Sequence, residues 1–256
     1  MSRFHHLEFG EPEPTPKCAP AQAGENESSC MHQARTLFAA GHFAKALRAY
    51  ARTLEYNPQN DEAWAGQVRM LLELHENTEA MNWANRALDQ CPDSAEVLAA
   101  KAVASARAGD PAAALTFSDA SIAANNQLPY AWLARADVLL TRKQKGFDSC
   151  FERALACSPS QWMTRWLISR ILLLHQLFAL ALQHIQHALE TGADQAVVWH
   201  QLAVCRLNLG MPADAATALH HARQLDPEIV TSQDLANLQQ TSWTKRLLGW
   251  WRRKHS

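Results

Sequence analysis

The sequence lacks the short motifs that usually carry catalysis. It contains no glycine-rich phosphate-binding loop, no HExxH zinc motif and no nucleophile elbow. No pair of carboxylates recurs in a constant context. Acid–base, nucleophilic and phosphoryl-transfer chemistry all need such groupings, because the reacting groups must be held at fixed positions relative to one another. The sequence therefore predicts a protein that is not an enzyme and that binds no cofactor.

The twelve histidines are the residues that could still bind a metal. His184 and His187 lie at i and i+3 on one face of an expected helix, and His175 could approach them. However, no cysteine or aspartate stands at ligand spacing beside them. The adjacent His220 and His221 point apart on a helix. We therefore expect no metal site.

The cysteines and the apolar stretches indicate where the protein works. The six cysteines form no CxxC pair, and the N-terminus has no apolar run of the kind that a secretory signal requires. Scattered cysteines without such a signal are typical of the reducing cytoplasm. The most apolar stretch, residues 166–182, carries Arg170 and His175 near its middle, so a membrane span is not expected. The predicted location is the cytoplasm, with a peripheral association with membranes left open by the C-terminus.

A unit of 34 residues, from 61 to 94, recurs along most of the chain. It has Trp64 at its fourth position, Ala80 and Ala87 at its twentieth and twenty-seventh, and Pro92 at its thirty-second. Apolar residues at helical spacing around Trp64 predict a first helix, and the small residues allow a second helix to pack closely against it. Pro92 ends the second helix. One such pair cannot bury its own apolar face, so neighbouring units are expected.

This pattern resembles the tetratricopeptide repeat, a helix-turn-helix unit of about 34 residues. Counting in both directions gives units over residues 27–60, 61–94, 95–128, 129–161, 162–195 and 196–229. The fourth unit is one residue short in the turn around Lys143 to Gly146, which puts Phe147 where a small residue should lie. The resemblance implies an all-α fold: a right-handed α-solenoid of about six repeats with a C-terminal capping helix, as in bacterial adaptor proteins of this family.

The N-terminal residues 1–26 differ in composition from the repeats. They are rich in glutamate and proline, which predicts a disordered tail. Phe4, Leu7 and Phe9 form a short apolar motif within it. The motif could dock on a protein surface, or it could be incidental. One hypothesis is that it docks in the groove of its own chain and competes there with a partner.

The C-terminal residues 230–256 combine a capping helix with a basic end. Thr231 or Ser232 could cap a helix that covers the last repeat. Beyond it, basic residues without any acidic residue accompany Trp243, Trp250 and Trp251. This composition predicts a short cationic amphipathic helix. It could contact an anionic membrane, nucleic acid or an acidic protein, or it could pack on the last repeat.

The resemblance also implies a binding surface. In tetratricopeptide repeats the first helices line a concave groove, into which positions 2, 5, 9 and 12 of each unit project. The corresponding residues proposed for a protein-binding groove are Arg35, Phe38, Arg69, Tyr130, Leu133, Asp137, Trp166, Arg170, Leu173 and His200. Trp166 follows the usual large packing position by one residue, so we expect its side chain to turn by about 100° toward the groove. Tryptophan, tyrosine and arginine dominate binding hot spots.

The groove differs from that of a known subclass of these repeats, and the difference indicates the kind of ligand. That subclass binds the C-terminal carboxylate of chaperones through Lys and Asn at positions 5 and 9 of neighbouring repeats. Here these positions hold Met31 and Arg35, then Ala65 and Arg69, so that carboxylate clamp is not reproduced. An apolar or mixed peptide with an acidic side chain paired to an arginine fits the groove better.

Together these observations predict a non-enzymatic cytoplasmic scaffold or adaptor that holds a peptide or helix of another protein in its groove. The main alternative is a peripheral membrane scaffold anchored by the cationic C-terminal helix. An RNA-binding helical repeat is a third interpretation. It is disfavoured because the inner face is not basic and the formal net charge is −1. No nucleic-acid partner is therefore expected.

Overall fold

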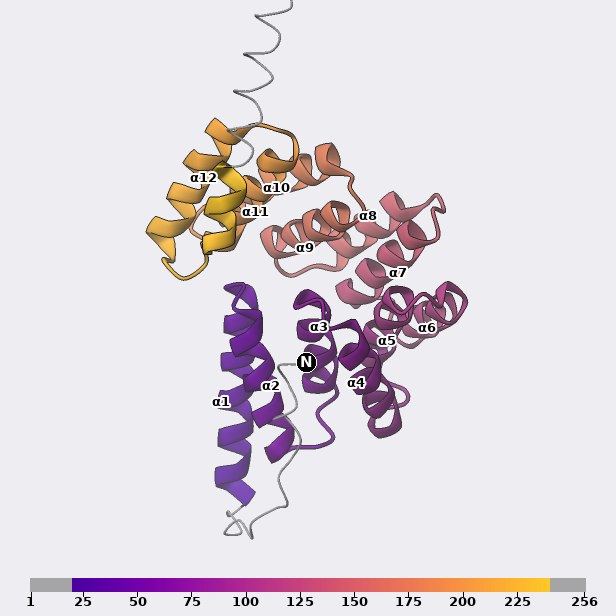
Figure 1. Ribbon diagram of the computed structural model, residues 1–256. Coiled ribbons are helices and arrows are strands. Elements are labelled where there is room, and N and C mark those ends of the chain that lie inside the picture. Colours follow the sequence, from indigo (N-terminus) through magenta and orange to yellow (C-terminus); the bar gives the residue numbers. More distant parts are fainter. Residues whose placement is uncertain (1–19, 240–256) are drawn as a thin grey trace, which may run out of the picture.

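The computed structural model describes residues 20–239, which fold into helices joined by short turns. The helices stack in antiparallel pairs, one pair to a repeat, into a curved solenoid (Figure 1). They are α1 (Pro20–Ala39), α2 (Phe43–Tyr56), α3 (Asp61–Glu73), α4 (Asn77–Gln90), α5 (Ala95–Arg107), α6 (Pro111–Ala124), α7 (Pro129–Thr141), α8 (Phe147–Cys157), α9 (Gln161–Leu174), α10 (Phe178–Gly192), α11 (Ala196–Asn208) and α12 (Pro212–Leu225). The predicted all-α solenoid of paired helices is confirmed.

The first helix is longer than its repeat. α1 begins at Pro20, inside the range 1–26 that composition assigns to a disordered tail. Proline lacks an N–H group and fixes φ near the helical value, so it is accepted in the first turn of a helix, where that N–H group has no partner in any case. The structure thus has residues 20–26 in α1, whereas composition predicts a disordered tail up to residue 26.

Small residues let the two helices of a repeat approach each other. Ala80, Ala84 and Ala87 of α4 are completely buried, as the repeat pattern requires. At two inner helices, α3 and α5, a side chain caps the free N–H groups of the first turn. Asn60 accepts a hydrogen bond of 2.8 Å from the N–H of Ala63 at the start of α3.

Tryptophans at the fourth position join consecutive repeats. The indole N–H groups of Trp64, Trp132 and Trp199 each donate a hydrogen bond to the backbone carbonyl six residues earlier, over 2.8, 2.8 and 2.7 Å. That carbonyl belongs to position 32 of the preceding repeat in all three cases. A large apolar ring with one polar atom can thus pack between repeats without leaving its N–H group unsatisfied.

Every repeat turns between its two helices through a left-handed residue at position 15. In three repeats this residue is glycine, and in the other three it is His75, Lys143 or Gln176, with φ of 62°, 54° and 61°. Residues with a side chain adopt this conformation at a cost of roughly 1 kcal/mol, whereas glycine does not pay it. The turn is therefore imposed by the packing of the helices in half of the repeats.

Replacing Gln176 with glycine is expected to stabilise the protein. Gln176 is exposed, so the substitution removes backbone strain and few contacts. The free energy of unfolding should rise by about 0.5–1 kcal/mol, measured by chemical denaturation, after the greater flexibility of glycine in the unfolded chain is allowed for. Gln176→Ala is the control, because alanine keeps the strain. A loss of stability in Gln176→Gly would contradict this account of the turn.

The fourth repeat departs from the others in its second helix. α8 has 11 residues, whereas α4, α6 and α12 have 14 each. Phe147 stands at the position predicted for a small residue and is half-buried against Phe151, with 5.9 Å between the ring centroids. Among the described repeats, α8 packs more sparsely on the next inner helix than any other outer helix does. The junction between α8 and α9 is therefore the loosest in the solenoid.

The first repeat closes on the fifth and sixth repeats, at the left of Figure 1. The Trp166 ring of α9 lies 5.8 Å from the ring of Phe38 and 6.3 Å from the ring of Phe43, measured between centroids. The α1–α2 turn meets α11 at Gly41, where a Cβ atom would lie 2.8 Å from Cγ1 of Val197. Position 41 thus needs glycine for this close approach as well as for its φ of 79°. The solenoid is closed at this side rather than open along its length.

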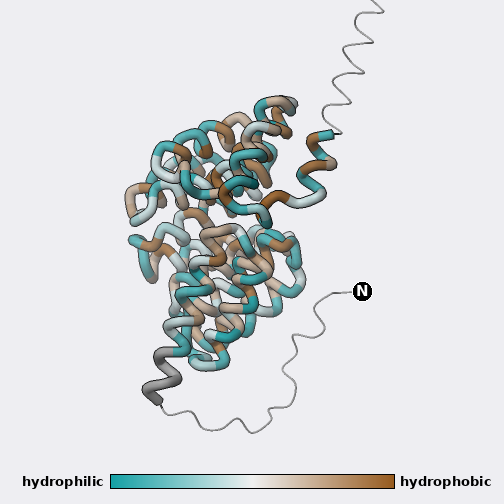
Figure 2. The backbone as a smooth tube through the Cα atoms, turned by 90° about the vertical axis from the view of Figure 1, so that its left-hand side faces the viewer, coloured by the Kyte–Doolittle hydropathy of each residue, from teal (hydrophilic) through white to brown (hydrophobic). Residues whose placement is uncertain are grey.

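A further helix, residues 232–239, covers the last repeat. Thr231 caps it: Oγ1 of Thr231 accepts a hydrogen bond of 3.2 Å from the N–H of Asp234, and the Asp234 carboxylate accepts one of 2.8 Å from the N–H of Thr231. Leu238 packs against the main core, whereas Leu235 is 43% exposed. Figure 2 shows this helix, with hydrophobic and hydrophilic segments, beside the body of the molecule. The predicted capping helix is confirmed.

Candidate functional site

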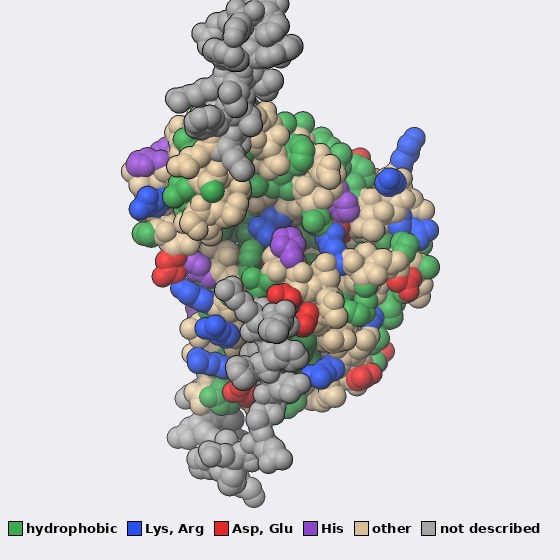
Figure 3. Space-filling model, in the orientation of Figure 1, with side chains coloured by type: hydrophobic (Ala, Val, Ile, Leu, Met, Phe, Trp, Pro, Cys, Tyr) green, Lys and Arg blue, Asp and Glu red, His purple; other side chains and the backbone are tan. Residues whose placement is uncertain are grey.

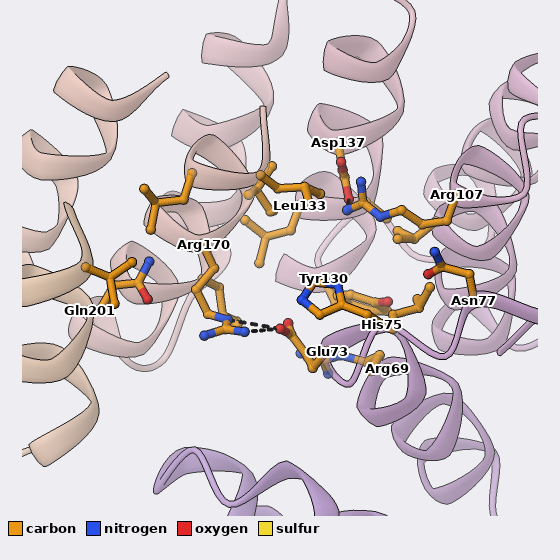
Figure 4. A pocket seen from close by; sticks show the side chains of 18 of the residues that line it. Arg69, Glu73, His75, Asn77, Arg107, Tyr130, Leu133, Asp137, Arg170 and Gln201 are labelled. Carbon is orange, nitrogen blue, oxygen red and sulfur yellow. Dashed lines mark hydrogen bonds and ion pairs between the residues drawn. The ribbon is translucent and has the colours of Figure 1, made fainter. Parts of the chain in front are cut away.

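A cavity of about 450 Å³ lies at the centre of the solenoid, near the C-terminal ends of the inner helices. Ten charged or polar side chains share its wall with the apolar residues Leu72, Val103, Leu133, Ala134, Leu167, Ile171, Leu173, Leu174, Phe178 and Val204. Figure 3 shows a hollow in this face of the molecule, with basic and histidine side chains beside it. Figure 4 shows the polar residues, which come from helices of the second to sixth repeats and point toward one another across the space.

Seven of the ten residues predicted for the groove line this cavity: Arg69, Tyr130, Leu133, Asp137, Arg170, Leu173 and His200. Arg35, Phe38 and Trp166 do not line it. Arg35 is exposed on α1 and forms an ion pair with Glu62 of α3, through Nε at 2.6 Å. This hydrogen bond raises the pKa of the Arg35 guanidinium. Arg35 therefore connects the first two repeats.

Trp166 is the predicted groove residue that the structure places most differently. Its side chain is 1% exposed and lies against Phe38 and Phe43, and Phe38 is itself 7% exposed. The residue does face inward, as its position in the repeat indicates. However, the first repeat occupies the space in front of it. Trp166 is therefore buried at this position and does not line the cavity.

Asp137 lines the cavity but its carboxylate is already occupied. Arg107 Nη2 donates to one carboxylate oxygen at 2.5 Å, and His175 Nε2 lies 2.7 Å from the other. The Asp137 residue is 2% exposed. This triad ties the ends of α5, α7 and α9 together, because a buried carboxylate needs partners for its charge. Asp137 is thus positioned to hold the cavity wall rather than to meet a ligand.

The second charged pair crosses the cavity. Arg170 of α9 donates from Nε to Glu73 of α3 over 3.0 Å, and also from Nη2 to the same oxygen (Figure 4). These two helices belong to the fifth and second repeats, so the pair joins parts of the chain that are 97 residues apart. The Arg170 guanidinium also lies 4.7 Å from the Phe43 ring centroid and 5.5 Å from that of Trp166.

Arg69 differs from the other two cavity arginines. Its guanidinium lies over Tyr130, 3.9 Å from the ring centroid, and 4.8 Å from the ring of Phe38. Among the described residues, no carboxylate forms a hydrogen bond or ion pair with it. Burial raises the pKa of the Glu96 carboxyl, and the positive charge of Arg69 opposes that rise. Burial also raises the pKa of Tyr130. Stacked on its faces, Arg69 keeps the edge of its guanidinium for an anionic partner.

Sequence reasoning missed Glu73 and Arg107, which complete both ion pairs. Each stands at position 13 of its repeat, one helical turn after the groove position 9. The helical period of 3.6 residues carries the inner stripe from position 9 to position 13, so the signal was present. His75, in the α3–α4 turn, and Asn77, the first residue of α4, also line the cavity. They were not predicted, because the expected groove positions 2, 5, 9 and 12 all lie on first helices.

The remaining expectations concern metal binding, membrane spans and the two tails. In the described part of the chain, no three His, Cys, Asp or Glu side chains are grouped to hold a metal ion. His184 is packed edge-on against Phe151, and burial lowers its pKa to about 4. Over the same residues, no helix combines the length and the apolar character needed to cross a membrane. The predicted tail contacts, Phe4, Leu7, Phe9, Trp243, Trp250 and Trp251, lie outside the described residues.

Comparisons with known proteins agree with the fold. A family model described as tetratricopeptide repeat matches residues 32–95, and no curated protein is similar in sequence to the chain. A tetratricopeptide repeat protein from Parabacteroides merdae is similar in structure, with 17% identity and a TM-score of 0.52 over 85% of this chain and 84% of that one. A thermophilic protein with these repeats from Thermus thermophilus has 20% identity and a TM-score of 0.52, over 76% and 99%.

A third similar structure is the Cut9–Hcn1 hetero-tetramer of the APC/C. The identity is 15% and the TM-score 0.51, over 85% of this chain but only 43% of that one. At these identities the likeness shows the fold. The helix pairs, the small-residue contacts and the left-handed turns at position 15 recur with the repeat period along the described solenoid. With the family match over residues 32–95, they show that the chain has the tetratricopeptide repeat fold.

Proposed function

We propose that this protein is a non-enzymatic scaffold whose central cavity binds a short segment of another protein through apolar side chains and one acidic group. A tetratricopeptide repeat fold implies interaction with proteins, and the cavity gives this chain a place for it. The observation that carries the proposal is Arg69, a stacked guanidinium without a carboxylate partner among the described residues, in a wall whose other arginines are paired with carboxylates. The charges of Arg107 and Arg170 are already balanced by Asp137 and Glu73.

The size of the cavity limits what can enter. Its volume is about 450 Å³, in the lower half of the range of about 300–1,000 Å³ that is usual for ligand pockets. A long helix lying along the groove, as in some complexes of helical repeats, does not fit while the first repeat contacts Trp166. The ligand in this proposal is a short peptide segment.

The proposal is tested by selecting a ligand and then removing the arginine. Peptides are selected from a random display library on the full chain, and the affinity of the enriched peptide is measured by calorimetry. Arg69→Met, which keeps an apolar stem but removes the charge, is expected to weaken binding by about tenfold or more, since a hydrogen bond to a charged group contributes about 1.5–3 kcal/mol. Arg153→Met is the matched control, because Arg153 is exposed on α8.

Two results would contradict the proposal. Equal affinity for the wild type and Arg69→Met would show that the peptide does not use this arginine. Enrichment of peptides without any acidic residue would show that the charge of Arg69 does not select the ligand.

A further inference from the structure

The contact that closes the solenoid has the composition of an interface that can open and close. We call it the latch: the contacts of Phe38, His42, Phe43 and Lys45 with α9 and with residues 226–229. At its centre, the Phe43 and Trp166 rings are stacked at an interplanar angle of 16°. Side chains make most of these contacts, and the helices themselves stay apart, in contrast to neighbouring helices within the solenoid. Such an interface can separate without disturbing the repeats on either side.

The rim of the latch is polar. His42 Nε2 lies 2.9 Å from the Asp226 carboxylate, and Lys45 pairs with Glu228. The side chains of Lys45 and Glu228 are 54% and 64% exposed, so solvent screens their attraction and the pair contributes little. The pairs thus direct the two surfaces together, and the aromatic centre supplies most of the contact. This composition, an apolar centre with a polar rim, is typical of interfaces that form and dissolve.

A second feature allows movement at the opposite side of the solenoid. The shortened α8 packs sparsely on α9, so the backbones of the fourth and fifth repeats approach each other over a smaller area than those of other neighbouring repeats do. In a solenoid each repeat is held mainly by its neighbours, so a weak junction is where the stack bends at least cost. The weak junction precedes α9, the helix that carries Trp166 and Arg170.

From the latch and the weak junction together, we infer that repeats 1–4 and repeats 5–6 move as two bodies about the α8–α9 junction, and that release of the latch opens the central cavity to its ligand. This inference rests on the proposed function for the identity of the cavity as a binding site. The opening itself is a property of the free protein. It gives the scaffold a closed state, in which a bound segment is retained, and an open state, in which it is exchanged.

Arg170 links release of the latch to opening of the cavity. Its guanidinium contacts Phe43 and Trp166 in the latch and Glu73 in the cavity wall, and it lines the cavity. An arginine that stacks on aromatic rings can hold a carboxylate at its edge at the same time. When the latch opens, α9 moves away from α2 and α3, so Arg170 leaves Glu73 and Phe43 and keeps its contact with Trp166 on its own helix. Ligands that engage Arg170 therefore respond to the state of the latch.

Hydrogen exchange on the full chain without ligand tests the opening. In Phe43→Ala, amides of residues 226–229 and of α9 are expected to exchange about tenfold faster, because loss of an aromatic pair shifts an opening equilibrium by about that factor. Amides of α5 and α6 should keep the wild-type rate. X-ray scattering should show a larger radius of gyration. The matched control is Phe117→Ala, since Phe117 is also half-buried but lies in the third repeat, and it should leave the latch amides unchanged.

A second test changes the charges of the Lys45–Glu228 pair, so that the result does not depend on whether Phe43→Ala folds correctly. Lys45→Glu places two like charges at the exposed rim and should speed latch exchange about twofold; the double variant with Glu228→Lys should restore the wild-type rate. Latch amides that exchange at the wild-type rate in both Phe43→Ala and Lys45→Glu would overturn the inference. So would an equal increase at α5 and α6. If the latch opens as expected while no peptide is selected, the proposed function fails and the conformational inference stands.

Discussion

Replacing Trp166 with alanine is expected to lower the free energy of unfolding by about 3–5 kcal/mol. The side chain is 1% exposed and contacts the rings of Phe38 and Phe43. Its removal leaves a cavity that the surrounding helices cannot fill, and it deletes the contact between the first and fifth repeats. Chemical denaturation followed by far-UV circular dichroism measures the change without relying on tryptophan fluorescence, which the substitution itself alters.

Trp83→Ala is the matched control for this prediction. Trp83 is half-buried on α4 and pairs with Trp64, with 5.6 Å between the ring centroids. Because part of its surface already contacts water, its loss should cost about half as much. Equal losses for the two variants would contradict the difference in burial. A Trp166→Ala variant of wild-type stability with weakened ligand binding would instead support the exposed groove residue that the sequence predicts.

Trp166 also shows which structural features the repeat pattern can predict. The pattern determines which face of α9 the residue lies on, because a helix of 3.6 residues per turn has a fixed relation to its neighbours. Exposure at that face depends on a repeat that is far away in sequence. The position of the first repeat relative to α9 results from small rotations added over four repeats, one of which is shortened at Phe147. The pattern of residue types contains no information on these summed rotations. The direction of the Trp166 side chain was therefore predictable, and its burial was not.

The same reasoning applies to the charges. Arg69, Asp137 and Arg170 could be assigned to the inner face from their positions, and they line the cavity. Their partners could not be assigned, since the pair of Arg170 with Glu73 spans 97 residues. The difference matters for function, because an arginine with a carboxylate partner and an arginine without one offer a ligand different electrostatics. Only the pairing singles out Arg69.

The start of α1 constrains the hypothesis that the N-terminal motif docks in its own groove. α1 is 20 residues long, which corresponds to about 30 Å, and its cavity end is marked by Phe38. The chain between the motif and the helix is residues 10–19, which can span at most about 33–36 Å. The motif could therefore reach the cavity only with this segment almost fully extended along α1. The motif lies outside the described residues, and its docking, on its own chain or on another molecule, stays a prediction.

Asp137→Ala is the substitution with the second largest expected effect, a loss of about 3 kcal/mol in the free energy of unfolding. The carboxylate is buried, and it receives Arg107 at 2.5 Å and His175 at 2.7 Å. Its removal leaves a partly buried guanidinium without a partner, which is costly. Glu152→Ala on the exposed side of α8 should change stability by no more than about 0.5 kcal/mol. In Arg107→Ala with Asp137→Ala, part of the loss should be recovered, because neither charge then remains alone.

Asp137→Ala is expected to change the affinity for the selected peptide. The direction of that change distinguishes two roles for this carboxylate. If Asp137 contacted the ligand, as its groove position predicts, its removal would weaken binding. In the structure it neutralises Arg107 at the cavity wall. Removing it then leaves Arg107 as a second unpaired cation in the cavity that holds Arg69, so an acidic peptide should bind more tightly. Calorimetry with the selected peptide, at a temperature where the variant remains folded, measures this change. Weaker binding would restore Asp137 to the ligand site, whereas tighter binding that disappears in the Arg107→Ala double variant would establish it as the counter-charge.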